Sequence, residues 1–233
     1  MSVFATLVEH LADLLQPLFG ASAAAAAIVL FTAAVRLLVH PLSRAAARGQ
    51  KARTALQPRI AELRRKHARN PERLQRAVLD LHAEEKVSPL SGLLPSLCQV
   101  PAFFLLYHLF SSTSIGGEAN ALLAHRLLAA PLGDRWTDAL GGDGPFGPAG
   151  LVYLALFAVV AAVATVNFLR ARRVPLPETG TGQEVPGLGA ITKVMPFLSF
   201  FTLVTVAVVP LAAALYVITS TTWSAVERAA LYR

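Results

Sequence analysis

One arginine inside an apolar stretch points most directly to chemistry in this sequence. Residues 14–35 carry no charge, and after Arg36 the next charged residue is Arg44. At ~1.5 Å per helical residue, Arg36 lies ~12 Å inside the point where the chain becomes basic. Thr32, Arg36 and His40 follow one another at four-residue spacing, so a helix would place a hydroxyl, a guanidinium and an imidazole on one face.

An arginine at this depth has two interpretations. The hydrocarbon core of a bilayer is ~30 Å thick, so Arg36 would lie well below the headgroups. Its side chain could snorkel toward the cytoplasmic headgroups along its own apolar stem. Alternatively it marks a functional site, because a charge in a span is costly unless it faces water or a partner. The depth and the polar face favour the functional interpretation.

Other polar residues could share this site. Gln99 lies in an apolar run, and Tyr216, Ser220 and Trp223 fall on one face of a later, hydroxyl-rich helix. Each alone is typical of ordinary interhelical hydrogen bonding. Together with an arginine they favour a wet cavity. We expect no acidic residue inside the spans, so the ligand should itself be acidic: an anion, a lipid phosphate or the acidic tail of a polypeptide.

The sequence contains none of the common catalytic or metal-binding motifs. There is no HExxH, Walker loop, GxGxxG or pair of cysteines, and the single cysteine, Cys98, lies in an apolar run. We therefore expect no enzyme activity, no catalytic residue, no metal and no cofactor.

The composition indicates an integral membrane protein. Of 233 residues, 55% are hydrophobic and 15% are charged, and the mean hydropathy is +0.54. The apolar residues come in blocks, which is not the pattern of a soluble core. The net charge of +7 is concentrated beside these blocks, so it predicts membrane topology and no nucleic-acid substrate.

The expected architecture is an all-α membrane protein with five transmembrane helices, an N-terminal interfacial helix and a cytoplasmic antiparallel helical hairpin between spans 1 and 2. A 33-residue uncharged run around Pro210 is too long for one span, so it is divided there. The expected segments are an outer interfacial helix at 1–18, span 1 at 19–43, the hairpin at 44–86, span 2 at 87–112, an outer loop at 113–147, span 3 at 148–169, a cytoplasmic loop at 170–189, span 4 at 190–209 and span 5 at 211–230.

Two details refine this plan. Asn70 followed by Pro71 predicts the start of the second hairpin helix. Pro41 should bend the inner end of span 1, and a short interfacial helix is expected around 119–130 of the outer loop. Residues 44–86 carry twelve Lys or Arg, whereas the outer loop carries two, so the N-terminus is expected outside and the C-terminus in the cytoplasm.

Residues 30–110 resemble the core of YidC-type membrane protein insertases, the YidC/Oxa/Alb family. The similarity is carried by the context of Arg36 with Pro41-Leu42, by Leu56-Gln57-Pro58, by Lys86-Val87-Ser88-Pro89-Leu90 and by the run from Pro95 to Tyr107 with Gln99 and Pro101. Later spans match in layout and at Leu215-Tyr216. Two departures are Val217, where many members have an aromatic residue, and Leu211-Ala212, where many have a glycine.

The resemblance implies a five-span core around a hydrophilic groove that is open to the cytoplasm and the lipid. Arg36, Thr32 and Tyr216 would line this groove, and nascent membrane proteins with acidic outer tails would be the substrates. Candidate partners are the Sec translocon, the signal recognition particle receptor, the ribosome and membrane lipids. The sequence shows no large outer domain and no long basic C-terminal tail, so we expect no ribosome contact through a tail.

The expected function is therefore insertion and folding of small membrane proteins in the cytoplasmic membrane, without enzymatic chemistry. A small anion or lipid transporter using Arg36 as its binding charge is the alternative, although nothing suggests the inverted repeat common in transporters. A purely structural assembly subunit would leave Arg36 unexplained.

Overall fold

The structure is a computed structural model that describes residues 2–87, 100–173 and 195–231, and this part of the chain is mostly helical. Its elements are, in chain order, α1 (Ser2–Phe19), the 3-10 turn η1 (Gly20–Ser22), α2 (Ala23–Leu38), α3 (His40–Lys66), α4 (Pro71–Glu84), α6 (Val100–Ser111), β1 (Ser114–Ile115), β2 (Glu118–Ala119), η2 (Ala121–Ala124), β3 (Arg126–Leu127), β4 (Ala130–Pro131), α7 (Trp136–Gly141), α8 (Pro148–Arg173), η3 (Met195–Phe200), α10 (Phe201–Val208) and α11 (Leu211–Leu231).

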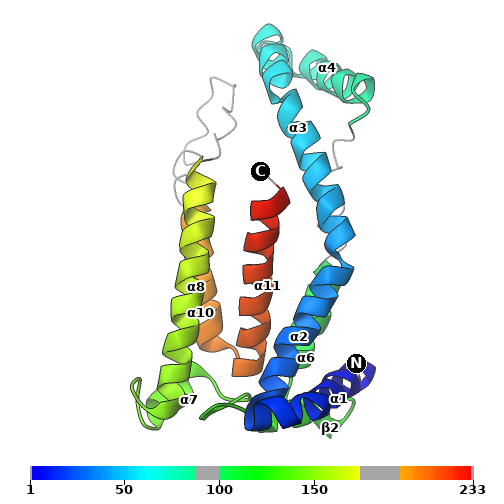
Figure 1. The fold of residues 1–233 in the computed structure, drawn as a ribbon. Coiled ribbons are helices and arrows are strands. Elements are labelled where there is room, and N and C mark those ends of the chain that lie inside the picture. The colour runs from blue at the N-terminus through cyan, green and yellow to red at the C-terminus, as the bar shows by residue number, and fades with distance from the viewer. Residues whose placement is uncertain (1, 88–99, 174–194, 232–233) are drawn as a thin grey trace.

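Helix α11 is the central element of the bundle. It contacts α2 and α6 on one side and α8 and α10 on the other (Figure 1). Its first eight residues, 211–218, are all buried, and three of them are alanines. Small side chains let helices approach closely, so this half of α11 packs against several neighbours at once.

Helix α1 lies across one end of the bundle. Gly20 has a φ of +52°, a backbone conformation that glycine adopts without strain, and the chain turns there between α1 and α2. Buried residues of α1, such as Val8 and Ala12, pack with the alanine-rich start of α2 (Figure 1). The turn makes α1 a separate helix from α2, in an arrangement typical of an interfacial helix.

The connection between α6 and α8 contains small strands. β1 pairs with β2 and β3 pairs with β4, each antiparallel and two residues per strand. The short helix predicted around 119–130 is reduced to the 3-10 helix η2 between these strands, and the all-α expectation holds only apart from the hairpins. Gly116 and Gly117 have positive φ angles, which suit a tight hairpin turn. The Asn120 amide donates to the carbonyls of Leu109 and Ser112, which fastens the hairpin to the end of α6.

This same connection holds the start of α11. The backbone N–H groups of Leu211 and Ala212 donate to the carbonyls of Asp134 and Leu132, at 2.8 and 2.9 Å. The Tyr153 hydroxyl of α8 also donates to the Asp134 carbonyl. The first N–H groups of a helix have no partner within it, so these bonds satisfy donors that would otherwise be unpaired.

The helix is interrupted at Val39, before residue 43, the end expected for span 1. Helix α2 ends at Leu38 and α3 begins at His40, with Pro41 in its first turn. Proline has no N–H to donate to the carbonyl of Leu37 and its ring clashes with that carbonyl, which favours an interruption of the helix there. The interruption lies beside Pro41, where a bend of the helix was expected.

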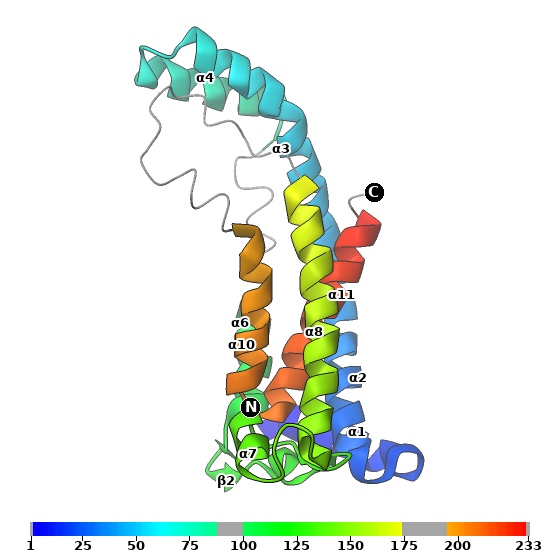
Figure 2. The ribbon, with the colours of Figure 1, turned by 90° about the vertical axis from the view of Figure 1, so that its left-hand side faces the viewer.

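Helices α3 and α4 project beyond the far end of the bundle (Figure 2). They pack through a small cluster of Leu56, Ile60 and Leu81. The Asn70 side chain accepts from the N–H of Arg73 at 3.0 Å and so caps the start of α4. This cluster is isolated from the main core, so the packing of α4 depends on very few side chains.

Helical stretches suited to a membrane occur in the described part of the chain. Val3–Leu38 and Pro148–Arg172 are long and apolar enough to cross one, and Phe197–Val208 is a shorter apolar helix. The first stretch is bent at η1, so α2 alone, with 16 residues, spans ~24 Å.

The α3–α4 packing yields a first prediction. Leu81→Ala should destabilise this packing by ~2–3 kcal/mol, because it removes a buried side chain from a three-residue cluster. Hydrogen exchange of α4 amides should accelerate while α11 amides are unchanged. Leu79→Ala is the matched control on the same helix, since Leu79 is 53% exposed and should matter by less than ~0.5 kcal/mol. Equal acceleration by both variants would contradict this assignment.

Candidate functional site

Arg36 meets α11 at Ser220. The Arg36 Nε donates to the Ser220 Oγ at 3.0 Å, and the Arg36 Nη2 contacts the same oxygen. Arg36 is half-buried, whereas Ser220 is 2% exposed. Helix α2 thus directs its one arginine toward the polar face of the central helix.

Tyr216 lies one turn before Ser220 and joins this site to α6. Its ring packs between Phe103 and Phe110, with centroids 5.7 and 5.9 Å away. Its hydroxyl donates to the Phe103 carbonyl at 3.4 Å. Tyr216 is 2% exposed, so it forms a wall of the site at the interface of α6 and α11.

His40 contacts an acidic residue near the end of α11. The His40 Nδ1 lies against the Glu227 Oε1, and the Glu227 side chain is 9% exposed. Glu227 directly follows the uncharged run 194–226, and α11 continues past it to Leu231. This contact joins the start of α3 to the last turns of α11.

The other predicted site residues lie differently. The Thr32 hydroxyl donates to the Ile28 carbonyl of its own helix at 2.7 Å, and Thr32 is fully buried. The proton of its hydroxyl is therefore used within α2. The Trp223 Nε1 is buried and has no hydrogen-bond partner in the described part of the chain. Gln99 lies outside the described residues.

The charge of Arg36 is not neutralised by an ion pair within the described residues. Glu227 and Arg228 are the charged groups that act on it electrostatically, and their effects have opposite signs. Glu227 is held by His40. A neutral hydroxyl is thus the direct partner of Arg36, which leaves its positive charge available to an acidic group.

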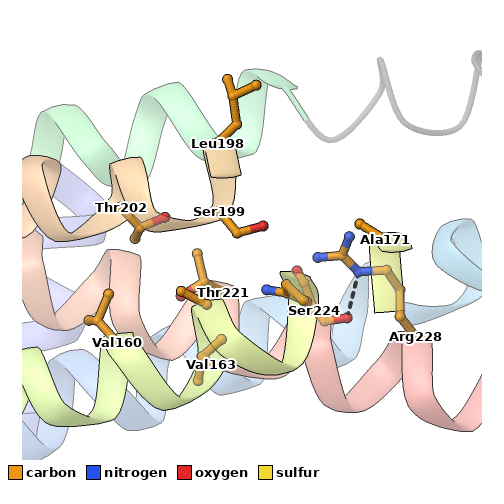
Figure 3. A pocket seen from close by; sticks show the side chains of 11 residues that line it. Val160, Val163, Ala171, Leu198, Ser199, Thr202, Thr221, Ser224 and Arg228 are labelled. Atoms are coloured by element: carbon orange, nitrogen blue, oxygen red, sulfur yellow. Dashed lines mark hydrogen bonds between the residues drawn. The ribbon is translucent and has the colours of Figure 1, made fainter. Parts of the chain in front are cut away.

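A second polar feature lies beside this site. An open pocket of about 370 Å³ lies between α8, η3, α10 and α11 (Figure 3). Its lining residues are Val160, Val163, Ala164, Asn167, Ala171, Leu198, Ser199, Thr202, Thr221, Ser224 and Arg228. We call it the Arg228 pocket.

The sequence analysis missed the Arg228 pocket as a site. Thr221, Ser224 and Arg228 are spaced as i, i+3 and i+7, which puts them on one face of α11, adjacent to the face of Ser220. That spacing is visible in the sequence. Asn167 on α8 and Thr202 on α10 lie near this face of α11 only because the three helices pack together, so the sequence could not reveal that they line the same pocket.

The arrangement is suited to binding. The described residues contain no group of three or more His, Cys, Asp or Glu that could hold a metal ion. Arg36 and Arg228 each place a positive charge next to hydroxyl groups within the helical bundle. Such a site can hold an acidic group and release it without covalent chemistry.

Comparison with known proteins gives the family. The family model described as "60Kd inner membrane protein" matches residues 14–233. Similar proteins include three named "Membrane protein insertase YidC": that of Clostridium perfringens, 42% identical over 36% of this chain; that of Prosthecochloris aestuarii, 30% identical over 74% of it; and that of Magnetococcus marinus, 42% identical over 35% of it.

The chain spans only part of these relatives. The matched regions cover 35%, 28% and 15% of their own lengths, in the same order. The family model nevertheless covers nearly all of this chain, including α2, α8 and α11. The sequence resemblance to YidC-type proteins is thereby confirmed, and this cell-membrane protein belongs to the 60Kd inner membrane protein family.

Proposed function

We propose that this chain inserts small membrane proteins into the cytoplasmic membrane and helps them fold, acting as a chaperone without enzymatic chemistry. The observation that carries the proposal is the half-buried Arg36, which is bonded to the hydroxyl of Ser220 and forms no ion pair within the described residues. Family membership supports the general activity.

The acidic outer tail of a substrate would take the place of Ser220 as the partner of Arg36. A hydrogen bond between a guanidinium and a carboxylate is about twice as strong as one to a neutral group. The tail could therefore displace the hydroxyl, and Ser220 could return when the tail leaves. Such an exchange binds the tail only transiently, as is required of a site that the tail must leave to cross the membrane.

Two forces would complete insertion. Burial of the substrate's apolar segment in lipid yields ~25 cal/mol per Å². The membrane potential favours outward movement of negative tail charge by ~2.3 kcal/mol per charge per 100 mV. Arg36 needs only to lower the barrier for the tail to enter the apolar region.

The proposed topology places the basic end in the cytoplasm. The α3–α4 region, the end of α8, whose sequence includes Arg170 and Arg172, and the end of α11 lie toward one end of the bundle, and the β hairpins lie at the other (Figure 1). Retention of basic segments inside accounts for this asymmetry. The five expected spans would correspond to α2, α6, α8, α10 and α11, each with its flanking residues.

The partners remain part of the proposal. Nascent membrane proteins with acidic outer tails are the proposed substrates, and the Sec translocon, the signal recognition particle receptor and the ribosome are candidate partners. A transporter that uses Arg36 as its binding charge is not favoured by the family match.

The topology can be measured by cysteine labelling. In a Cys98→Ala background, a cysteine at position 65 should react with a membrane-impermeant maleimide only after cells are opened, because α3 carries many basic residues. A cysteine at position 128, in the exposed turn between β3 and β4, should react in intact cells. The reverse pattern would overturn the orientation.

The role of Arg36 can be measured by protease protection of substrate tails in vesicles. Arg36→Ala should slow insertion of acidic-tailed substrates about tenfold or more, because it removes a charge-assisted hydrogen bond. Substrates with neutral tails should be affected less. Arg36→Lys should retain much of the activity, since a flexible tail needs charge more than a planar fork.

Ser220→Ala is the matched control for this experiment. It removes the hydroxyl partner and keeps the charge, so acidic tails should still insert at a near-normal rate. A snorkelling arginine predicts a different outcome, in which Arg36→Ala inserts acidic-tailed substrates normally; that result would refute the role proposed for Arg36.

A further inference from the structure

The Arg228 pocket has the charge of an anion site. Among the described residues that line it, Arg228 is the one that is charged, and none is acidic. The Arg228 Nε donates to the Ser224 carbonyl at 3.1 Å, which fixes the guanidinium at the pocket (Figure 3). Its terminal nitrogens form no hydrogen bond within the described residues, so they can donate to a ligand.

Hydrogen-bond donors approach from the opposite wall. Asn167, Ser199 and Thr202 line the pocket from α8, η3 and α10, and none of them has a hydrogen bond in the described part of the chain. An amide and two hydroxyls can all donate to an oxyanion. With Arg228 they form a set of unused donors around one space.

The wall formed by α11 presents acceptors. The Thr221 hydroxyl donates to the Val217 carbonyl at 2.8 Å, and the Ser224 hydroxyl donates to the Ser220 carbonyl at 2.9 Å. Their protons are used within the helix, so their oxygens offer lone pairs. Such acceptors fit hydroxyl groups, which a bare phosphate ion at neutral pH offers poorly and a glycerol headgroup offers well.

The pocket has an exposed apolar side chain on its η3 side. Leu198 lines the pocket and is 62% exposed, and Phe201, one turn later and outside the lining, is 65% exposed. A ligand that filled the pocket with a charged, hydroxylated head could lay an acyl chain along these side chains. The chemistry therefore matches an amphiphile better than a free anion or an acidic peptide.

The pocket also lies at the basic end of the bundle. Arg170 donates to the Ala225 carbonyl at 2.7 Å, and Arg172 is exposed beside it on the last turns of α8. In the topology proposed above this end faces the cytoplasm, and basic pockets between membrane helices on that side are suited to anionic headgroups. The position of the Arg228 pocket, its charge and the apolar side chain at its edge therefore all favour an anionic lipid as its ligand.

We propose that the Arg228 pocket binds an anionic phospholipid with a hydroxylated headgroup, of which phosphatidylglycerol is the simplest example. The phosphate lies against Arg228, Asn167 and Thr202, the headgroup hydroxyls face Thr221 and Ser224, and an acyl chain follows the apolar side chain at the edge of the pocket. This site is distinct from the Arg36–Ser220 contact and does not depend on insertase activity.

The test is native mass spectrometry of the purified full chain in detergent, titrated with phosphatidylglycerol, phosphatidylcholine, glycerol 3-phosphate or a short acidic peptide. Phosphatidylglycerol should bind most tightly. Arg228→Gln should weaken its binding about tenfold or more, the effect of losing a charge-assisted hydrogen bond. Arg172→Gln, which removes the same charge from a residue that does not line the pocket, should change it by less than about twofold.

Two results would overturn the proposal. One is an equal loss for Arg228→Gln and Arg172→Gln, which would indicate unspecific attraction to basic residues. The other is an acidic peptide that displaces phosphatidylglycerol in a manner that Arg228→Gln abolishes, which would assign the pocket to a substrate tail. If Arg228→Gln fails to fold, Ser199→Ala with Thr202→Val decides, because it keeps the charge; unchanged binding would then refute the site.

Discussion

A positive charge inside an apolar bundle is the constraint on which the other features depend. Arg36 lies near the end of α2, where this helix packs against α11, and its guanidinium bonds to Ser220 of α11. A carboxylate in place of this serine would neutralise the charge and lock the two helices together, because breaking a buried ion pair is costly. The hydroxyl instead stabilises the arginine while leaving its charge accessible. This balance makes the contact suitable for a transient acidic ligand.

The end of the bundle that carries the β hairpins provides the rigidity that such a contact requires. Backbone bonds from Leu211 and Ala212 to the connection between α6 and α8 fix the start of α11, and the buried first half of the helix holds it among its neighbours. Toward its other end, α11 contacts polar side chains as well as apolar ones. His40 binds Glu227 there, which links the start of α3 to the same helix. The bundle is thus tightly packed at one end and polar at the other.

Much of this organisation could be predicted from sequence, because it depends on local physical chemistry. Uncharged runs, prolines and the concentration of basic residues indicated a helical membrane protein and divided it at Pro210. Asn70 and Pro71 indicated the start of α4, since capping depends on neighbouring residues alone. The polar face of Tyr216, Ser220 and Trp223 also followed from helical spacing. The family followed from motifs in residues 30–110, and the family match confirms it.

Other features depend on contacts between distant residues, and only the tertiary structure decides them. Helical spacing placed Thr32 on the face of Arg36, and the structure adds that Thr32 is buried with its hydroxyl bonded to the carbonyl of Ile28. The partner of Arg36 lies 184 residues away, and Glu227 became visible as a site acid only when α11 carried it to His40. The Arg228 pocket joins side chains from three separate parts of the chain. The sequence alone therefore determined the helices and the charge they carry, whereas the tertiary structure determined which polar groups meet, because that depends on packing and not on periodicity.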